Sequence, residues 1–422
     1  MAQTSDRTLT EIRRDLHTYP EAGWKEFRTT ALIAEELDER GFTLHLGSDA
    51  VNPDGRLGVP PEDEIKAAVE RARNEGAPEQ YLDAMEGITG LVAEKEYGDG
   101  SGPIVGVRID MDALERTEAQ DNDHRPAREG FASTHPNEMH ACAHDGHTTI
   151  GLGIARELDA NGGFDGTLKL FFQPAEEGGR GGKPMSETDH LNDVEYLIAL
   201  HLGLDEETGT IIAGYERPLS NAKLDVNYRG EPAHAGGAPH EGRNALQAMA
   251  TAIQNCYAIP RHGDGVTRVN VGMVRSDNPQ NIIAEDAKMR VEVRGGTADL
   301  NDYMLSKARR VVEHAAGMHD VEYETSLYGK TVTFEADDEL VDLFMDVGED
   351  LDLVQHVKRT VDFGGSEDAS YLIRKVQETG GKATYIGVGA SNPYGHHTSR
   401  FDIEEESLEI GVAAVTEAIR SL

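Results

Sequence analysis

The sequence predicts an α/β fold: a main domain with a mixed, largely parallel sheet flanked by helices, and an α+β domain inserted into it. Short apolar, β-branched runs alternate with helix-length segments in the first half of the chain, as in sheets with parallel strands. Near Arg217 this order changes to that of a compact α+β unit. The chain has 422 residues, which indicates two or more domains.

The N-terminal segment predicts two helices. Apolar residues recur at helix spacing through TLTEIRRDLHTYPEAGWKEFRTTALIAEELDERGF, and Pro20 and Gly23 divide the pattern. A polar segment, 48–86, follows and holds one helix over 61–74. The apolar stripe of this helix consists of Ile65, Ala68, Val69 and Ala72. We interpret the segment as an insertion that either covers a substrate entrance or carries a solvated surface helix.

Four apolar runs then predict strands: GITGLVAEKEY, GPIVGVRIDMDAL, GTLKLFFQPAEEG and VEYLIALHLG. The segment HTTIGLGIARELDAN among them predicts a helix. In parallel sheets, ligands bind beyond the carboxyl ends of the strands. Polar residues stand at those ends in this chain, namely Asp110, Asp112, Glu176, Glu177 and His201.

The inserted domain is expected over 217–330. Its run AKLDVNYRGEPAHAGGAPHEGRNALQAMATAIQNCYAI predicts strand, loop and helix, and VTRVNVGMVRS and AEDAKMRVEVRGG predict two strands. A helix in LNDYMLSKARRVVEHAAGM and one or two strands in VEYETSLYGKTVTF complete it. The main domain is therefore expected over 1–216 and 331–422, and its last part holds helices and the strand ATYIGVG.

Composition excludes several classes of partner. With 77 acidic and 40 basic residues the formal net charge is −37, which argues against nucleic acid and anionic membranes. Carboxylates spread along the whole chain, as in proteins of extreme halophiles. The N-terminus lacks the apolar core of a signal peptide and no apolar run is long enough to span a bilayer, so we expect a soluble, cytoplasmic protein.

The stretch MHACAHDGHTTIG gathers three histidines, an aspartate and one of only two cysteines. Cys142 and His144 are two residues apart, a spacing that lets thiolate and imidazole turn toward the same metal ions. Alone, this pattern is also compatible with surface histidines. The other cysteine, Cys256, lies in an apolar helical pattern and is expected to be a small buried hydrophobe, so no disulfide framework is predicted.

Two adjacent carboxylates in QPAEEG strengthen the metal hypothesis. Glu176 and Glu177 repel each other at a strand end unless a cation or a proton-transfer role offsets the repulsion. One can bind metal while the other acts as a general base on water, although a solvated turn is the alternative. His201 ends an apolar strand, where a histidine is often structural. His396 and His397 in YGHHTSRFD stand in a polar loop and are either ligands or exposed residues.

Other catalytic motifs fail. GGRGGKP resembles a phosphate-binding loop, but its glycine spacing is wrong and Pro184 replaces the required Ser or Thr. The chain has no H-E-x-x-H helix, no G-x-S-x-G turn and no G-x-G-x-x-G dinucleotide motif.

Taken together, these residues resemble the aminoacylase and carboxypeptidase family of dinuclear metallopeptidases, in its amidohydrolase branch. The markers span nearly the whole chain: RRDLHTYPEAGWKEF, VRIDMDAL, MHACAHDGHT, FQPAEEG, LHLG, HAGGAPHEGRNAL, GGSEDASYL and HHTSRFDIEEE. The resemblance implies two divalent metal ions (zinc, manganese or cobalt) with the ligands Cys142, His144, Glu177, His201 and His397. Cys142 would bridge the ions as a thiolate. His397 is chosen over His396 because Thr398 and then Arg400-Phe401 follow it, close to the family's pattern.

The resemblance also implies roles outside the ligand set. Glu176 would be the general base, and the inserted domain a dimerisation or lid domain. His234 would reach a neighbouring subunit's site and stabilise the oxyanion there. Asn281 and Arg294 would hold the amino-acid part of the substrate, although Arg294 also fits an ordinary strand arginine. Ala284 replaces the proline usual in the family, which we expect to loosen a loop beside the substrate.

The implied activity is hydrolysis of the amide bond of a small N-acyl or N-aroyl amino acid. A carboxypeptidase or dipeptidase of the same family, or a non-catalytic metal-binding subunit of a heteromer, remains an alternative. The chain would act as a homodimer or as a heterodimer with a homologous subunit.

Overall fold

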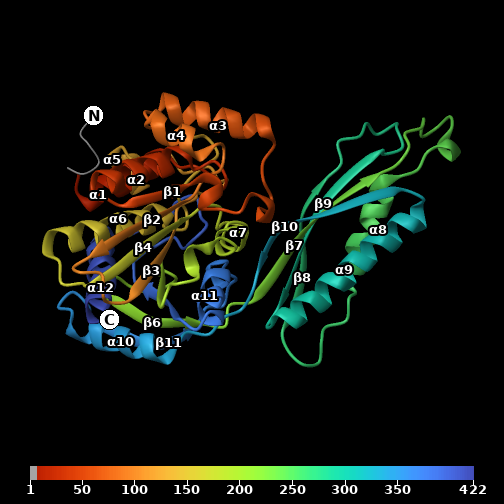
Figure 1. Cartoon of the computed structure of the whole chain (residues 1–422). Coiled ribbons are helices and arrows are strands. Elements are labelled where there is room, and N and C mark those ends of the chain that lie inside the picture. The colour runs from red at the N-terminus through yellow and green to blue at the C-terminus, as the bar shows by residue number, and fades with distance from the viewer. Residues whose placement is uncertain (1–6) are drawn as a thin grey trace. The chain divides into compact units, whose positions relative to one another are not determined.

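The computed structural model describes residues 7–422, which form two compact units (Figure 1). The first unit runs to Glu216 and resumes over Phe334–Phe363 and Asp368–Leu422. The second comprises Arg217–Thr333 with the short segment Gly364–Glu367. Within residues 7–422, no helix combines the length and the apolar character that a bilayer crossing requires.

An eight-stranded sheet forms the centre of the first unit, in the order β1-β2-β4-β3-β5-β12-β6-β11. The four central strands β4, β3, β5 and β12 run parallel, and β12 also pairs antiparallel with β6. This confirms the predicted mixed, largely parallel sheet. The strands are β1 (Thr43–Leu46), β2 (Leu91–Tyr97), β3 (Ile104–Asp110), β4 (Gly166–Gln173), β5 (Tyr196–Leu202), β6 (Thr210–Glu216), β11 (His356–Asp362) and β12 (Lys382–Val388).

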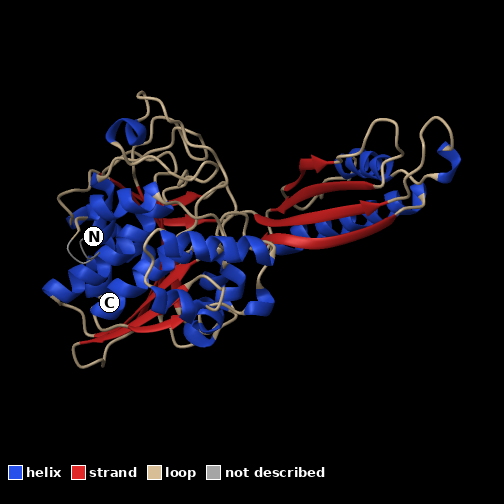
Figure 2. Ribbon diagram, turned by 90° about the horizontal axis from the view of Figure 1, so that it is seen from above, coloured by secondary structure: helices blue, strands red, loops and turns tan. Residues whose placement is uncertain are grey.

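Helices cover both faces of this sheet (Figure 2). Side chains alternate between the two faces, so Leu170 of β4 enters one apolar core and Phe171 the other. The larger core lies under α1, α2, α6, α10 and α12, and the smaller one under α7 and α11. The helices are α1 (Leu9–Thr18), α2 (Phe27–Glu39), α3 (Glu62–Asn74), α4 (Glu79–Met85), α5 (Arg125–Glu129), α6 (His144–Asn161), α7 (Gly182–Ser186), α10 (Asp338–Asp350), α11 (Ala369–Glu378) and α12 (Glu406–Ser421).

Helix α1 shows how local sequence sets an element. Thr8 accepts a hydrogen bond from the backbone N–H of Glu11, whose carboxylate accepts one from the N–H of Thr8. This reciprocal cap satisfies donors that a helix start leaves unpaired. The helix ends before Pro20, and α2 starts at Phe27, which confirms the predicted break between two helices.

The segment 48–86 packs on the first unit through α3 and α4. Ala68 and Ala72 of α3 are buried in the larger core, together with side chains of α4. Two ion pairs attach the segment to the loop that precedes α6. Glu75 lies 2.7 Å from His135 Nε2, and Arg71 lies 2.8 Å from Glu138. More than half of the residues of α3 are exposed, so α3 is a surface helix that packs on the core through one face, and a role in covering a substrate entrance stays a prediction.

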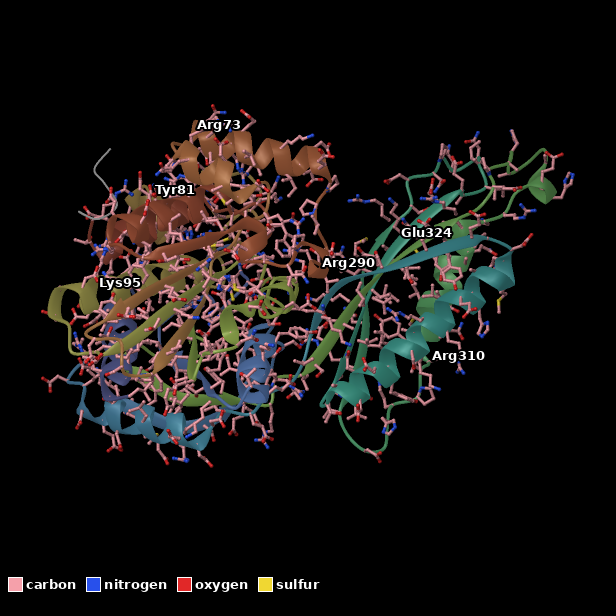
Figure 3. All side chains as sticks on the ribbon, in the orientation of Figure 1. Arg73, Tyr81, Lys95, Arg290, Arg310 and Glu324 are labelled. Atoms are coloured by element: carbon pink, nitrogen blue, oxygen red, sulfur yellow. The ribbon has the colours of Figure 1, made fainter. Side chains whose placement is uncertain are left out.

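The second unit is a four-stranded antiparallel sheet, in the order β10-β7-β9-β8, with α8 and α9 packed on one face. Arg290 lies on the other face, where it pairs with Asp225 and stacks 3.2 Å from the ring centre of Tyr328 (Figure 3). The run VEYETSLYGKTVTF forms a single strand. The elements are β7 (Ser220–Arg229), α8 (Ala245–Tyr257), β8 (Thr267–Arg275), β9 (Asp286–Gly295), α9 (Ala298–His319) and β10 (Glu322–Thr331).

Candidate metal centre

The carboxyl ends of three neighbouring strands meet at one edge of the larger sheet. Strand β3 ends at Asp110, Glu176 and Glu177 follow β4, and His201 lies one residue before the end of β5. Cys142 and His144 join them from the start of α6, which begins at His144. Parallel pairing of β4, β3 and β5 brings these side chains together, as their positions in the sequence predict.

The loop after β12 brings His397 to the same place, because its backbone N–H donates to the carbonyl of Ala141, 2.8 Å away. Cys142 Sγ then lies 3.3 Å from His397 Nε2 and 3.5 Å from His201 Nε2. His397 Nε2 lies 3.4 Å from a carboxylate oxygen of Glu177.

Three groups with donor atoms within 4.8 Å of one another link these residues through shared members. The groups are Cys142–His144–His201, Cys142–Glu177–His397 and His144–Glu176–Glu177. The structure thus places the six predicted residues of the first unit in one cluster. His396, in contrast, points its Nε2 at the carbonyl of Leu202, 3.2 Å away.

The donor atoms suit divalent cations. His144 Nε2 is buried without a hydrogen-bond partner, while its Nδ1 lies 2.8 Å from the carbonyl of Asp112. His201 is held in the same way, since its Nδ1 donates to the carbonyl of Leu202 at 2.8 Å and its Nε2 is turned toward Cys142. A ring fixed through one nitrogen, with the other presented to a cation, is the usual state of a histidine ligand. The mixture of thiol, imidazole and carboxylate fits borderline divalent ions.

Burial sets the charge of Cys142 and His201, whereas burial at His144 is outweighed by the Asp110 and Asp112 carboxylates, which raise the pKa of His144 well above its usual value. Burial raises the pKa of the Cys142 thiol, and the nearby Glu177 and Glu176 carboxylates raise it further. Burial also lowers the pKa of His201 well below its usual value, aided by His147, so the ring is neutral and able to ligate. A thiol of this kind becomes a thiolate when a bound cation displaces its proton.

Two aspartates support the cluster, one by bonding to its acidic residues and the other by bonding to side chains beside it, and the sequence alone assigned them no role beyond their position. The carboxylate of Asp112 accepts hydrogen bonds from the backbone N–H groups of Glu176 and Glu177, both at 3.0 Å. Asp110 accepts from His147 Nδ1 and from Arg108 at 2.7 Å. The available signal was the pair of aspartates at the end of the apolar run of β3.

Left-handed backbone recurs at the cluster. Ala143, between Cys142 and His144, has φ 66°, Ala175, before Glu176, has φ 51°, and His397 itself has φ 59°. Each such residue costs roughly 1–3 kcal/mol, and such conformations persist where the surrounding structure imposes them. The turns that present four of the six side chains are therefore strained.

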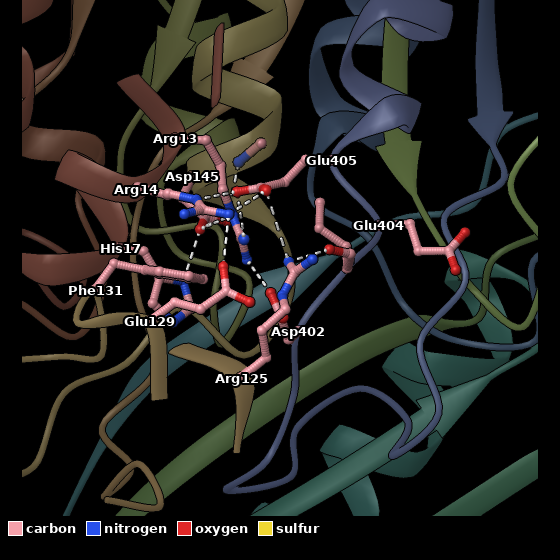
Figure 4. Close-up of polar contacts among 12 residues, drawn as sticks. Arg13, Arg14, His17, Arg125, Glu129, Phe131, Asp145, Asp402, Glu404 and Glu405 are labelled. Carbon is pink, nitrogen blue, oxygen red and sulfur yellow. Dashed lines mark hydrogen bonds and ion pairs between the residues drawn. The ribbon is translucent and has the colours of Figure 1, made fainter. Parts of the chain in front are cut away.

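A buried ion-pair network lies behind the start of α6 (Figure 4). Arg13 of α1 contacts Asp145 at 2.9 Å and Asp402 at 2.8 Å. His17 lies 2.8 Å from Asp145 and 3.0 Å from Glu118. Burial opposes a charge on His17, but these two carboxylates outweigh it and raise the pKa of His17 to about 9. The network fixes the residue that follows His144.

The remaining predicted residues lie in the second unit. His234 forms a β-bridge with Ile282, and the N–H of Ala235 donates to the carbonyl of Asn281 at 2.9 Å. This segment precedes β9, whereas Arg294 lies at the other end of β9, paired with Asn221 and bonded to Glu292. At 3.4 Å per residue, Arg294 lies roughly 27 Å along β9 from Asp286, the first residue of the strand. The structure brings His234 and Asn281 together but keeps Arg294 away from both.

The glycine-rich run GGRGGKP, which resembles a phosphate-binding loop, binds the carboxylate of Asp368 instead of a phosphate. The backbone N–H groups of Gly181 and Gly182 donate to Asp368 at 3.0 Å and 2.8 Å. A Cβ on Gly181 would lie 1.6 Å from the carbonyl oxygen of Pro174, so only glycine fits there.

Three features of the sequence resemble one of the subunits of p-aminobenzoyl-glutamate hydrolase, the A subunit. They are the insertion before GITGLVA, the run RPAREGFAS, and ACAHDGHTTIGLG, with alanine where relatives usually have glycine. The model of peptidase family M20/M25/M40 matches residues 106–421.

Similar proteins of known name cover nearly the whole chain. The A subunit of p-aminobenzoyl-glutamate hydrolase from Escherichia coli (strain K12) is 40% identical over 96% of this chain and 93% of its own. The indole-3-acetyl-aspartic acid hydrolase of Enterobacter agglomerans is 42% identical over the same shares. The crystal structure of an aminobenzoyl-glutamate utilization protein from Klebsiella pneumoniae superposes with a TM-score of 0.83, at 35% identity over 98% of this chain and 95% of that one.

Proposed function

Because this chain belongs to peptidase family M20/M25/M40 and is a metal-dependent hydrolase of amide bonds, we propose that it splits p-aminobenzoyl-glutamate into p-aminobenzoate and glutamate. The convergence of Cys142, His144, Glu176, Glu177, His201 and His397 on one strand edge carries the proposal. The named relatives hydrolyse or use amides of an acidic amino acid with an aromatic acid, which supports this substrate class.

We assign Cys142, His144, Glu177, His201 and His397 as ligands of two divalent ions, either zinc, manganese or cobalt. When bound, such ions lower the pKa of water and polarise the scissile carbonyl. Cys142 is central because its sulfur lies within 3.5 Å of both His201 and His397, which suits a thiolate shared between two ions.

Glu176 is the general base in this proposal. Its carboxylate lies beside Glu177 at the edge of the cluster and is only partly buried, so it remains accessible to water and substrate. It takes a proton from the attacking water and delivers it to the nitrogen of the departing amino acid. Asp112 fixes its backbone position through the hydrogen bond to its N–H.

The groups that bind the oxyanion and the amino-acid part of the substrate come from the second units of two copies of the chain. One copy of this unit cannot present His234, Asn281 and Arg294 to a single glutamate, because Arg294 lies at the opposite end of β9. We therefore assign oxyanion stabilisation to His234 from a neighbouring copy of the chain. The side chains of Asn281 and Arg294 are assigned to bind the amino-acid part of the substrate.

The surface of the second unit supports an assembly. Apolar side chains are exposed on its edge strand β8 and on α8, including Val274 at 55% and Tyr257 at 48% exposure. An unpaired edge strand flanked by apolar side chains is typical of a protein–protein interface. The partner is a second copy of this chain or a homologous protein.

The test is hydrolysis of p-aminobenzoyl-glutamate in concentrated salt with added manganese. Indole-3-acetyl-aspartate, hippurate, N-acetyl amino acids and a dipeptide are measured alongside, each with a chelator control. Chelator-sensitive release of p-aminobenzoate, faster than cleavage of the others, is expected. Faster cleavage of the dipeptide would replace the proposal with a dipeptidase activity. Metal binding without turnover of any substrate, alone or with a homologous partner chain, would indicate a non-catalytic role in a heteromer.

A further inference from the structure

A second cluster of metal-binding side chains lies in the first unit, on residues the proposed catalytic site does not use. His45 belongs to β1, the edge strand of the sheet, and Asp49 to the short helix Gly47–Asp49 that follows it. His190 lies in another short helix, Asp189–Leu191, between α7 and β5. Two segments 141 residues apart in the chain therefore supply one group.

The three side chains converge on one point. The Nδ1 of His45 lies 2.7 Å from one carboxylate oxygen of Asp49, and the Nε2 of His190 lies 3.5 Å from the other. The two imidazole rings lie 4.3 Å apart, centre to centre, and are tilted by 46°. Donor atoms from all three residues lie within 4.8 Å of one another.

These separations match those of a cation's ligands. Around a tetrahedral zinc ion with bonds near 2.1 Å, neighbouring donor atoms are about 3.4 Å apart. The observed 2.7 and 3.5 Å bracket that value, so small side-chain rotations close the group around an ion. The backbone carbonyl oxygen of Asp49 is a fourth candidate ligand atom, 3.1 Å from His190 Nε2.

The residue types favour a cation as well. Two imidazole nitrogens and a carboxylate oxygen form the ligand set of many divalent transition-metal sites. His45 and His190 are 24% and 15% exposed, so an ion can enter from solvent and keep a water ligand.

We propose that His45, Asp49 and His190 bind a third divalent transition-metal ion, of the zinc class, which joins the edge strand β1 to the segment between α7 and β5. The ion has a structural role, because it cross-links two surface segments that are far apart in the sequence. It is independent of the metal pair at Cys142, because the two clusters share no residue.

The stoichiometry of bound zinc tests the proposal. The full-length protein is freed of metal with a chelator, equilibrated with Zn²⁺ by dialysis, and assayed by mass spectrometry of the metal. His190→Ala and Asp49→Asn are compared with wild type, and His356→Ala, an exposed histidine on the opposite edge strand β11, is the matched control.

The wild type and His356→Ala are expected to bind one zinc ion more per chain than His190→Ala and Asp49→Asn. All four proteins are expected to keep the metal-dependent hydrolysis, because this metal site lies outside the catalytic cluster. Equal zinc content in wild type and both variants, with folding checked by circular dichroism, would overturn the proposal. In that case Asp49 only bridges the two histidines by hydrogen bonds.

Discussion

The guanidinium of Arg13 and the carboxylate of Asp145 meet at 2.9 Å, and neither side chain has any exposed surface. Asp145 directly follows His144, so this ion pair determines where the first turn of α6 lies. Asp402 also contacts Arg13, and His17 also contacts Asp145. The position of a proposed metal ligand therefore depends on a residue near the N-terminus.

Arg13→Met is expected to reduce the free energy of unfolding by about 3 kcal/mol, because it removes a buried guanidinium from Asp145 and Asp402, which then keep His17 and Arg125 as cationic partners. Denaturant unfolding at constant salt measures the change. Arg14→Met is the control, since Arg14 is 31% exposed and its ion pair with Glu405 is worth about 1 kcal/mol or less. Equal losses in the two variants would contradict the argument.

Glu176→Gln is expected to lower kcat by about 10²–10⁴-fold while the bound metal stays unchanged, because the amide cannot accept the proton of the attacking water. Steady-state kinetics measures the fall in kcat, and metal analysis of the same sample shows whether the metal content is unchanged. Glu177→Gln serves for comparison and is expected to lose metal. If Glu176→Gln lost metal instead, Glu176 would be a ligand and the roles of the two residues would be reversed.

Asp112→Asn is expected to weaken metal binding by about 10–100-fold, although Asp112 is not itself among the proposed ligands. Its carboxylate accepts the N–H groups of Glu176 and Glu177, and an amide presents only one acceptor oxygen to them. Competition with a fluorescent chelator measures the affinity. Asp123→Asn, an exposed aspartate of the following loop, should leave it unchanged. An Asp112→Asn protein with wild-type affinity would refute the positioning role.

The attachment of the segment 48–86 is expected to weaken at alkaline pH. Burial opposes a charge on His135, but Glu138 and Glu75 outweigh it and raise the pKa of His135 to about 9. A raised histidine pKa gives stability that is complete below about pH 6.5, the unfolded value, and is lost as pH rises through about 9.

Thermal and denaturant unfolding between pH 6 and 10 measure this loss. Wild type is expected to lose roughly 1 kcal/mol more over that range than His135→Gln, because solvent and salt screen part of the interaction. His17 titrates in the same window in both proteins, so the difference between them isolates His135. Parallel pH profiles would show that His135 carries no such charge.

Mixing two inactive variants tests whether His234 acts across subunits. Glu176→Ala and His234→Ala each disable every site in their own homodimer. In a mixed dimer, one site keeps Glu176 and receives His234 from its partner, so random exchange restores roughly a quarter of the wild-type activity. If no activity returns after verified subunit exchange, His234 acts within its own chain.

The sequence predicts the parts of the fold whose patterns are local. The four runs of β2, β3, β4 and β5 lie where they are expected. Strands β3, β4 and β5 are largely apolar because parallel strands are buried on both faces, whereas β2 pairs antiparallel and is apolar only in its first half. Strands β1, β6 and β11 were not predicted. The edge strands β1 and β11 carry exposed polar residues and have little apolar signal, whereas the missed β6 is buried and mostly apolar. Helix α4, with seven residues, is too short for a helical period to stand out.

The candidate site shows the same division. Cys142, His144, Glu176 and Glu177 are visible in the sequence because they stand close together in short motifs. The roles of Asp112 and Arg13 are not visible, because their partners lie 64 and 132 residues away. Cys256 is buried within α8, which confirms the small hydrophobe that its apolar helical pattern predicts. The sequence could therefore identify most of the site residues, but it could not predict the hydrogen bonds and ion pairs that hold them, because these join residues far apart in the chain.

The place of β12 between β5 and β6 has a consequence for biosynthesis. Strands β5 and β6 leave the ribosome before the whole second unit, and β12 leaves after it. At 5–20 residues per second, the interval is roughly 10–40 s. During that time the facing edges of two apolar strands have no partner and are open to pairing with other nascent chains. We therefore expect the yield of this protein in a foreign host to rise with chaperone capacity during translation, and a gene fragment that stops before β12 to aggregate.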